Sequence, residues 1–334
     1  RKMNSFQLIK QLLKQKSTHL RELTSQEAYK LYNFKSFEQT LMNDLTYDEK
    51  DIEPVKENVI KDRREEACVF FDFETTTEGE IHVPYCAYTD KNLDGYWGAD
   101  CALLMLRDLT RKYGSHKTQK MPNCIRCFAH HLGYDMRFLV NHLYKVETLD
   151  KGSGIMCGSG TFYYGDKRLV IHFTDTLRMI NMPLSKFGET FHLDTQKEIL
   201  PYNLYTQVNV AKRVLPLRIC LPSVDDEADK ATITPCKHTR EEYRKIFLTN
   251  CKRWGCFCDG GGVDILKYSG EYCKMDVLTL KGGYYKFRSL VQEAIGLDIT
   301  DYVTLASMAH DHLIQQGCYD GVIQMSGVPR AFIH

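Results

Sequence analysis

The chain has 334 residues, of which 43% are hydrophobic, so it can bury one large core or two smaller ones. Its formal net charge of +1 excludes neither nucleic acids nor small molecules as partners, because a balanced chain can still carry a local basic groove. Thirteen scattered cysteines without a signal peptide favour a reduced intracellular protein, whether of nucleus, mitochondrion or cytoplasm, over a disulfide scaffold. No apolar run reaches the length of a membrane span, so we expect no membrane partner.

Residues 1–66 are polar and charged, and a helical spacing of apolar residues predicts a helical N-terminal extension, at Phe6, Ile9, Leu12 and Leu13. From Ala67 onward, short apolar runs alternate with turn residues. They predict strands at 67–74, 81–89, 124–130, 160–165 and 168–174. They predict helices at 100–113, 134–144, 183–191, 240–254 and 263–292. Strands followed by helices indicate an α/β protein with a mixed sheet flanked by helices.

One region interrupts this alternation of strands and helices. Residues 201–262 contain Pro216 and Pro222, an acidic run at 225–227 and three consecutive glycines at 260–262. Prolines and glycines break regular elements, so this composition predicts an insertion with its own loops.

Two acids lie inside an apolar run of the chain. The stretch at 67–76 (ACVFFDFETT) has the composition of a strand that is buried on both faces of a sheet. Side chains at i and i+2 of a strand point the same way, so Asp72 and Glu74 share one face. Burying two carboxylates is costly unless a cation receives them, and carboxylate oxygens suit Mg²⁺ or Mn²⁺. The alternative is a strand end whose acids reach solvent.

Two later segments carry acids that could complete such a site. Asp135 follows an apolar strand where a helix begins, at the sheet edge where α/β proteins bind their ligands. The alternative role for Asp135 is helix capping. Tyr272 and Asp276 are four residues apart on a predicted helix and therefore project from one face. The alternative there is an ordinary amphipathic helix.

Together these segments resemble a known family. The order D-x-E, then a strand ending in (Phe/Tyr)-Asp, then Tyr-x-x-x-Asp on a helix resembles the DEDDy 3′–5′ exonucleases, the ribonuclease H-like proofreading domains of family-B DNA polymerases. The words DFETTT at 72–77 and HHLGYD at 130–135 resemble the protein-primed branch, found in phages, linear plasmids and virus-like mobile elements. TDTL at 174–177 resembles that branch's motif for contacting single-stranded DNA, and KEIL at 197–200 resembles its catalytic-lysine motif. The resemblance covers roughly residues 67–330.

The resemblance implies a role for each matching residue. Two divalent ions, Mg²⁺ or Mn²⁺, would be held across the scissile phosphate by Asp72, Glu74, Asp135 and Asp276. Tyr272 would orient the attacking water, and Lys197 would offset the charge that develops on the phosphate. The last bases of a frayed strand would be cradled by Thr75, His131, Thr176 and Leu177. The branch usually has Asn at the position of His131.

The resemblance also divides the chain and suggests partners. It implies a charged helical extension at 1–66, an exonuclease domain at 67–298 with the insertion at 201–262, and a truncated start of a polymerase domain at 299–334, without the palm. The implied partners are single-stranded DNA or a primer 3′ end, with a terminal protein as a further candidate. The alternative function is a catalytically lapsed nucleic-acid-binding domain derived from a mobile element. The presence of all four carboxylates and Tyr272 favours the active nuclease.

The cysteines offer weak metal signals. Cys124 and Cys127 have zinc-ligand spacing but fall on a predicted core strand. A denser group lies in the insertion, at Cys236, His238, Cys251, Cys256 and Cys258. Its Cys-x-Cys spacing is poorer than Cys-x-x-Cys for a structural site, so we expect buried free thiols rather than structural zinc.

Overall fold

The computed structural model describes residues 52–54, 66–76, 81–151, 154–231, 239–319 and 323–325. The chain forms two compact units, one of Arg1–Asn58 with Leu313–His334 and the other of Val59–His312. In the first unit, β1 (Ile52–Pro54) pairs antiparallel with β13 (Ile323–Met325). The apolar residues of the predicted N-terminal helix lie outside the described residues. Within the described part of the chain, no helix is long and apolar enough to cross a membrane.

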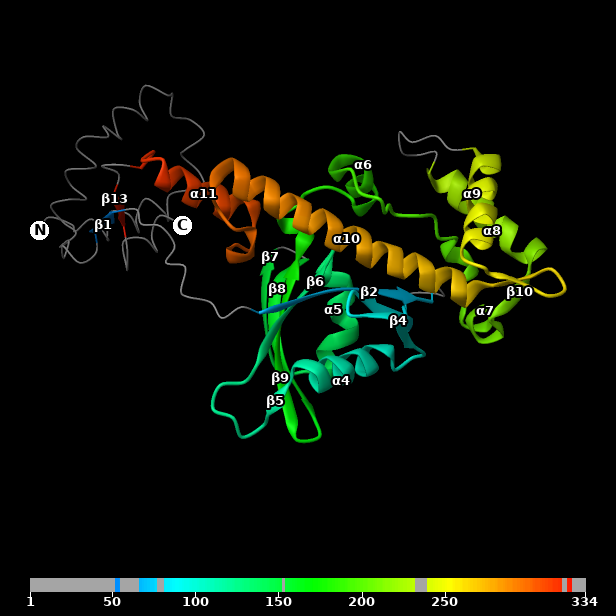
Figure 1. Cartoon of the computed structure of the whole chain (residues 1–334), viewed down its shortest axis with the longest axis horizontal. Helices are drawn as coiled ribbons and strands as arrows, with labels where there is room; N and C mark the ends of the chain where they lie inside the picture. Colours follow the sequence, from blue (N-terminus) through cyan, green and yellow to red (C-terminus); the bar gives the residue numbers. More distant parts are fainter. Residues whose placement is uncertain are drawn as a thin grey trace, which may run out of the picture. The chain divides into compact units, whose positions relative to one another are not determined.

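The second unit is built on an eight-stranded sheet (Figure 1). Its strands are β2 (Ala67–Thr75), β3 (Pro84–Thr89), β4 (Asn92–Trp97), β5 (Ser115–His116), β6 (Cys124–Ala129), β7 (Tyr144–Lys151), β8 (Gly154–Tyr164) and β9 (Lys167–Asp175). They follow the order β4-β3-β2-β6-β9-β8-β7, and β5 pairs with the edge of β9. β2, β6 and β9 run parallel, whereas the other neighbours are antiparallel. The predicted mixed sheet of a ribonuclease H-like fold is confirmed.

Helices cover both faces of this sheet. Among the described residues, the α-helices are α4 (Cys101–Tyr113), α5 (Leu132–Leu139), α6 (Phe187–Phe191), α7 (Gln207–Lys212), α8 (Leu217–Ala231), α9 (Arg240–Arg253), α10 (Ile265–Ile295) and α11 (Leu305–Gln315). Short 3-10 turns are η2 (Val140–His142), η3 (Thr176–Arg178), η4 (Leu184–Lys186), η5 (Tyr202–Leu204) and η6 (Ile299–Asp301). α4 and α5 lie on one side of the sheet and the long α10 lies on the other (Figure 1).

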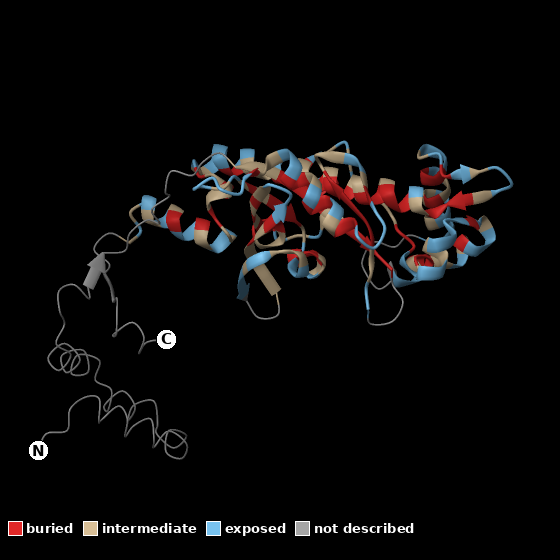
Figure 2. Cartoon of the chain, turned by 90° about the horizontal axis from the view of Figure 1, so that it is seen from below, coloured by how far each residue is buried: buried red, intermediate tan, exposed pale blue. Residues whose placement is uncertain are grey.

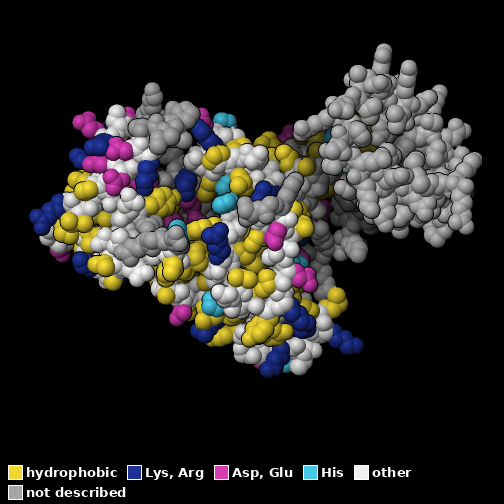
Figure 3. Space-filling view, turned by 180° about the vertical axis from the view of Figure 1, so that it is seen from behind, with side chains coloured by type: hydrophobic (Ala, Val, Ile, Leu, Met, Phe, Trp, Pro, Cys, Tyr) yellow, Lys and Arg dark blue, Asp and Glu magenta, His cyan; other side chains and the backbone are white. Residues whose placement is uncertain are grey.

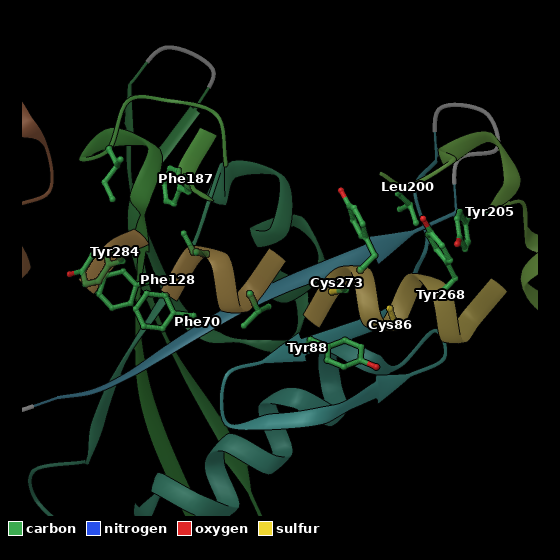
Figure 4. Close-up of a cluster of buried hydrophobic side chains, with 14 of the residues drawn as sticks. Phe70, Cys86, Tyr88, Phe128, Phe187, Leu200, Tyr205, Tyr268, Cys273 and Tyr284 are labelled. Carbon is green, nitrogen blue, oxygen red and sulfur yellow. The ribbon is translucent and has the colours of Figure 1, made fainter. Parts of the chain in front are cut away.

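The alternation of β2 distributes its side chains between two hydrophobic cores. Val69, Phe71 and Phe73 pack with α4 and α5, while Phe70 packs with α10. Phe70 stacks on Phe128 of β6 with ring centroids 5.1 Å apart (Figure 4). The buried residues of these cores follow α10 and the strands that pack against it (Figure 2). Because side chains alternate, the face of β2 that points to α10 is also the face of its two acids.

The segment 201–262 holds more regular structure than the predicted loops. Besides α7, α8 and α9 it contains β10 (Val214–Pro216), β11 (Phe257–Cys258) and β12 (Gly262–Asp264). α9 begins with a capping box in which Thr239 and Glu242 each accept from the other's backbone N–H. Cys220, Phe247 and Cys251 are buried in the same core as α10, so this segment extends that core.

One helix end and two strands differ from prediction for identifiable reasons. The helix expected at 134–144 ends as α5 at Leu139, and the edge strand β7 starts at Tyr144. The sequence prediction missed β7 because this strand carries charged residues and is not an apolar run. β4 was missed for a similar reason, because its Asn, Asp and Gly are typical of turns.

The contact between α10 and α6 gives a stability prediction. A Cβ built on Gly283 would lie 2.2 Å from a ring carbon of the fully buried Phe187, so Gly283→Ala should destabilise the protein by about 1–3 kcal/mol. At the neighbouring Gly282, the nearest atom would be 3.4 Å away, so Gly282→Ala should be neutral or slightly stabilising. Urea unfolding of both variants tests this contrast. Equal stabilities would contradict the close packing of α6 on α10.

Candidate active site

The four predicted carboxylates line one cleft at the carboxyl ends of β2 and β6. The cleft has a volume of about 300 Å³. Its polar lining consists of Asp72, Glu74, Thr75, His82, His130, His131, Tyr134, Asp135, Lys197, Tyr202, Tyr272 and Asp276. Residues that are up to 204 positions apart in sequence, from Asp72 to Asp276, therefore meet at one place.

Asp72 and Glu74 reach the cleft from the same face of β2. Asp72 is half-buried, and Glu74 is 6% exposed. Burial raises the pKa of Asp72 to about 7, and the negative charge of Asp276 acts in the same direction. Burial, followed by the charge of Asp72, raises the pKa of Glu74. These shifts indicate that the ionised forms of both carboxyl groups are destabilised in this cleft unless a cation is bound.

Asp135 enters from the first turn of α5 and is only 3% exposed. Burial and the nearby charge of Asp72 raise its pKa. The turn before α5 is held by His131, whose backbone adopts the left-handed conformation with φ 75°. The N–H of His131 donates to Oδ1 of Asp175 at 2.9 Å, and the same oxygen accepts from the N–H of Leu177 at 3.1 Å. Asp175 thus ties together the two loops that follow β6 and β9.

Asp276 and Lys197 form an ion pair at the other wall of the cleft. The Nζ of Lys197 donates to Oδ2 of Asp276. Burial, the largest single effect, lowers the pKa of Lys197, but the charge of Asp276, the electrostatic effects of Tyr202 and Asp72 and the hydrogen bond to Asp276 together outweigh it. The pKa is therefore raised, and the ammonium stays charged. Among the described residues, Oδ1 of Asp276 is buried without a hydrogen-bond partner. That oxygen keeps its lone pairs free for a cation.

Tyr272 lies one turn before Asp276 on α10 and is fully buried. Its hydroxyl lies 3.0 Å from the hydroxyl of Tyr202, and the Nζ of Lys197 lies 4.8 Å from the centre of its ring. Burial raises the pKa of Tyr202 to about 12 and also raises the pKa of Tyr272, so both phenols are neutral. The sequence prediction missed Tyr202, whose only signal was its place five residues after Lys197 in a segment interpreted as an insertion.

A second cleft of about 560 Å³ continues from the first and shares His130, Asp72, Lys197 and Asp276 with it. Its further lining comes from Leu177, Asn181, Met182, Pro183, Leu184, Ser185 and Leu280, together with Phe71. This lining is mostly apolar and suits the faces of bases rather than phosphates.

The four residues expected to contact DNA take different positions. Leu177 lines the second cleft, whereas Thr75 and His131 line the first. The hydroxyl of Thr75 lies 2.7 Å from that of Tyr134. Thr176 is fully buried, and its hydroxyl donates to the carbonyl of Ala129 at 3.0 Å. Thr176 therefore holds the loop that presents Leu177 and does not itself face the cleft.

The donor set fits divalent metal ions. Four carboxylates converge in one cleft, burial raises their pKa values, and Lys197 offsets only one of the four charges. The open oxygen of Asp276 is a ligand atom without a partner in the described residues. Oxygen donors at this density are the preferred ligands of Mg²⁺ and Mn²⁺.

The two cysteines of β6 that have zinc-ligand spacing do not converge. Cys124 and Cys127 are three residues apart on β6 and point to opposite faces; Cys127 is buried in the core under α4 and Cys124 lies near Glu66 and His172. Cys251 and Cys256 are buried in the core along α10. Cys236 and His238 lie outside the described residues.

Comparison with known proteins identifies the family of the chain. Residues 116–316 match the family model of DNA polymerase type B, organellar and viral. The chain belongs to this family. Asp135, Lys197 and Asp276 lie inside the matched range of this type B polymerase family, while the D-x-E pair precedes it. No curated protein matches the chain in sequence.

Solved structures of phi29 DNA polymerase are similar to parts of the chain. The complex with single-stranded DNA matches with 14% identity and a TM-score of 0.35, covering 70% of this chain and 32% of that one. The ternary complex with primer-template DNA and nucleotides matches with 15% identity and a TM-score of 0.39, covering 76% and 34%. The chain thus spans about a third of the length of these polymerases.

Proposed function

We propose that this chain is the 3′–5′ exonuclease portion of a protein-primed family-B DNA polymerase. It would remove terminal nucleotides from single-stranded or mismatched DNA. The observation that carries the proposal is one cleft lined by Asp72, Glu74, Asp135 and Asp276, with Tyr272 and Lys197 beside them. In this proposal, residues 67–298 form the exonuclease domain, 1–66 an extension and 299–334 the start of the polymerase domain.

Each side chain has a task that its position supports. Two Mg²⁺ or Mn²⁺ ions, held by the four carboxylates, would activate water and stabilise the departing 3′ oxygen. The neutral hydroxyl of Tyr272, braced at 3.0 Å by that of Tyr202, would orient the attacking water. Lys197, charged and next to Asp276, would offset negative charge on the scissile phosphate.

The two clefts suggest how a strand would bind. Its terminal phosphate would lie at the carboxylates and its last bases along the apolar lining near Leu177, Pro183 and Leu184. Over the face drawn in Figure 3, basic and acidic side chains are interspersed. On this face, binding would depend on local contacts rather than on one basic patch. A frayed or mismatched end costs less to unpair than a matched one, which favours such ends as substrates.

Metal-dependent digestion of a 3′-labelled single strand tests this function. The chain should release labelled mononucleotides with Mg²⁺ or Mn²⁺, stop with a chelator and resume when metal is restored. A 5′-labelled strand should shorten progressively in the same reactions. Binding of the strand without any metal-dependent digestion would support the lapsed nucleic-acid-binding domain and overturn the nuclease.

Tyr272→Phe tests the role of the phenol. It keeps the ring but removes the hydroxyl that positions water, so the digestion rate should fall by about 10²-fold or less while DNA affinity changes little. Tyr284→Phe is the control, because Tyr284 is also buried on α10 but packs against Phe128 outside the clefts. If Tyr272→Phe instead lost binding while bound DNA was still cut at the normal rate, Tyr272 would be a packing or stacking residue.

A further inference from the structure

A buried thiol lies next to two carboxylates of the first cleft, those of Asp72 and Glu74. The Sγ of Cys273 and one carboxylate oxygen each of Asp72 and Glu74 all lie within 4.8 Å of one another. Cys273 is fully buried on α10, and its Sγ also donates to the backbone carbonyl of Asp72 at 3.5 Å. Figure 4 shows Cys273 on α10 and Cys86 close to it, on the strand side of the same core.

The position of Cys273 follows from helix geometry. It comes directly after Tyr272 and three residues before Asp276, and side chains three apart lie on the same helix face. α10 packs directly across β2. The helix that supplies an oxygen ligand at Asp276 therefore also presents a sulfur atom to the acids of β2.

A second, independent observation concerns Asp276. Oδ1 of Asp276 is buried and has no hydrogen-bond partner among the described residues, and Asp276 lines the same cleft as Asp72 and Glu74. The two carboxylates and the thiol form a mixed oxygen and sulfur donor set, and the open oxygen belongs to a residue that lines the same cleft. Mg²⁺ and Mn²⁺ use the oxygens alone, whereas Zn²⁺ and Cd²⁺ also bind thiolate strongly.

We propose that Cys273, Asp72 and Glu74 form a binding site for a thiophilic divalent ion, Zn²⁺ or Cd²⁺, that competes with the activating metal and arrests the nuclease. The binding of the ion depends on the donor geometry alone, whereas the arrest of the nuclease rests on the proposed function. When the sulfur–metal bond forms, the thiol proton leaves to solvent. Zn²⁺ exceeds Mn²⁺ in intrinsic affinity for such ligands, so low concentrations would suffice.

A second group of similar composition provides the control. Ligand atoms of Glu66, Cys124 and His172 also lie within 4.8 Å of one another. However, Glu66 already pairs with Arg126 at 3.2 Å and with His172 at 3.1 Å. A cation there would have to compete with a guanidinium group. We therefore expect no tight binding at Cys124, and Cys124→Ala is the matched control for Cys273→Ala.

Cadmium titration of the metal-free chain, followed by the ultraviolet sulfur-to-cadmium charge-transfer absorbance, tests binding. Because other cysteines contribute, the measurement is the difference between variants. Cys273→Ala should lose the tightest component, Cys124→Ala should keep it, and Asp72→Asn should weaken it while retaining the thiol. Excess Mn²⁺ should suppress the same component. An unchanged titration in Cys273→Ala, with Asp72→Asn also unchanged, would overturn the site; circular dichroism verifies that each variant is folded.

Inhibition by Zn²⁺ in the presence of Mg²⁺ tests arrest. Cys273→Ala should need at least roughly 10- to 100-fold more Zn²⁺ than the wild type, the range that loss of even an outer-shell partner costs a metal site. Equal inhibition of both proteins would overturn the arrest. If neither protein cut DNA, the proposed nuclease would fail, while the cadmium titration would still decide whether Cys273 binds metal.

Discussion

Asp276→Asn should abolish exonuclease activity while the protein remains folded. The substitution removes a metal ligand whose second oxygen is already open to a cation, and it also removes the partner of Lys197. Metal ions supply several kcal/mol of charge stabilisation in the transition state, so losing one should cost roughly 10³-fold or more in rate. Asp72→Asn should have an effect of the same size. The measurement is the initial rate of release of a 3′ label at saturating Mg²⁺.

Glu271→Gln provides the control for these losses. Glu271 lies on α10 next to Tyr272, but it is paired with Lys274 at 3.2 Å and does not line the cleft. Partly exposed i, i+3 pairs of this kind contribute little, so the rate of Glu271→Gln should stay near that of the wild type. Unchanged rates in both Asp72→Asn and Asp276→Asn would remove the four-carboxylate cleft from the mechanism, whatever nuclease activity the preparation showed.

The periodicity of strands and helices was enough to place the proposed site residues in pairs on shared faces. The alternation of a strand put Asp72 and Glu74 on one side of β2, and the i, i+4 rule put Tyr272 and Asp276 on one side of α10. Both rules depend only on the period of a regular element. The apolar run around Asp72 also marked β2 as a strand buried between two layers, which is the setting that raises the pKa of this acid.

What sequence could not supply were the contacts between distant segments. The hydrogen bond between Tyr202 and Tyr272 joins residues 70 positions apart, and the hydrogen bond from His131 to Asp175 joins residues 44 positions apart. No periodic pattern encodes such pairs, because loop geometry fixes them. Burial of Thr176 was hidden for the same reason. The motif placed it beside Leu177, but only the fold shows that successive residues of this turn point in opposite directions, inward and into the cleft.

The same acids predict how stability depends on pH when no metal is bound. Asp72 has a pKa of about 7 in the folded protein, raised by burial and by Asp276 from the ordinary value of 3.8. A raised carboxyl pKa means that the folded state holds the proton more tightly than the unfolded state. Between about pH 4 and pH 7, each unit of pH increase should therefore cost up to about 1.4 kcal/mol from this group alone. Glu74 and Asp135 shift in the same direction and add to the loss.

Urea unfolding in the presence of a chelator, at about pH 5 and about pH 8, measures this loss. The wild type should lose stability between the two values, and Asp72→Asn should lose less, because an amide carries no charge at either pH. Relative to the wild type, the variant should therefore gain stability as pH rises. Adding Mg²⁺ at the higher pH should restore the wild type by mass action but restore the variant less, since it lacks a ligand. If the wild type gained stability relative to Asp72→Asn between the two pH values, this prediction would be wrong. Such a result would show that the acids of the cleft already have a compensating cation, and that Lys197 neutralises more of their charge than its ion pair with Asp276 implies.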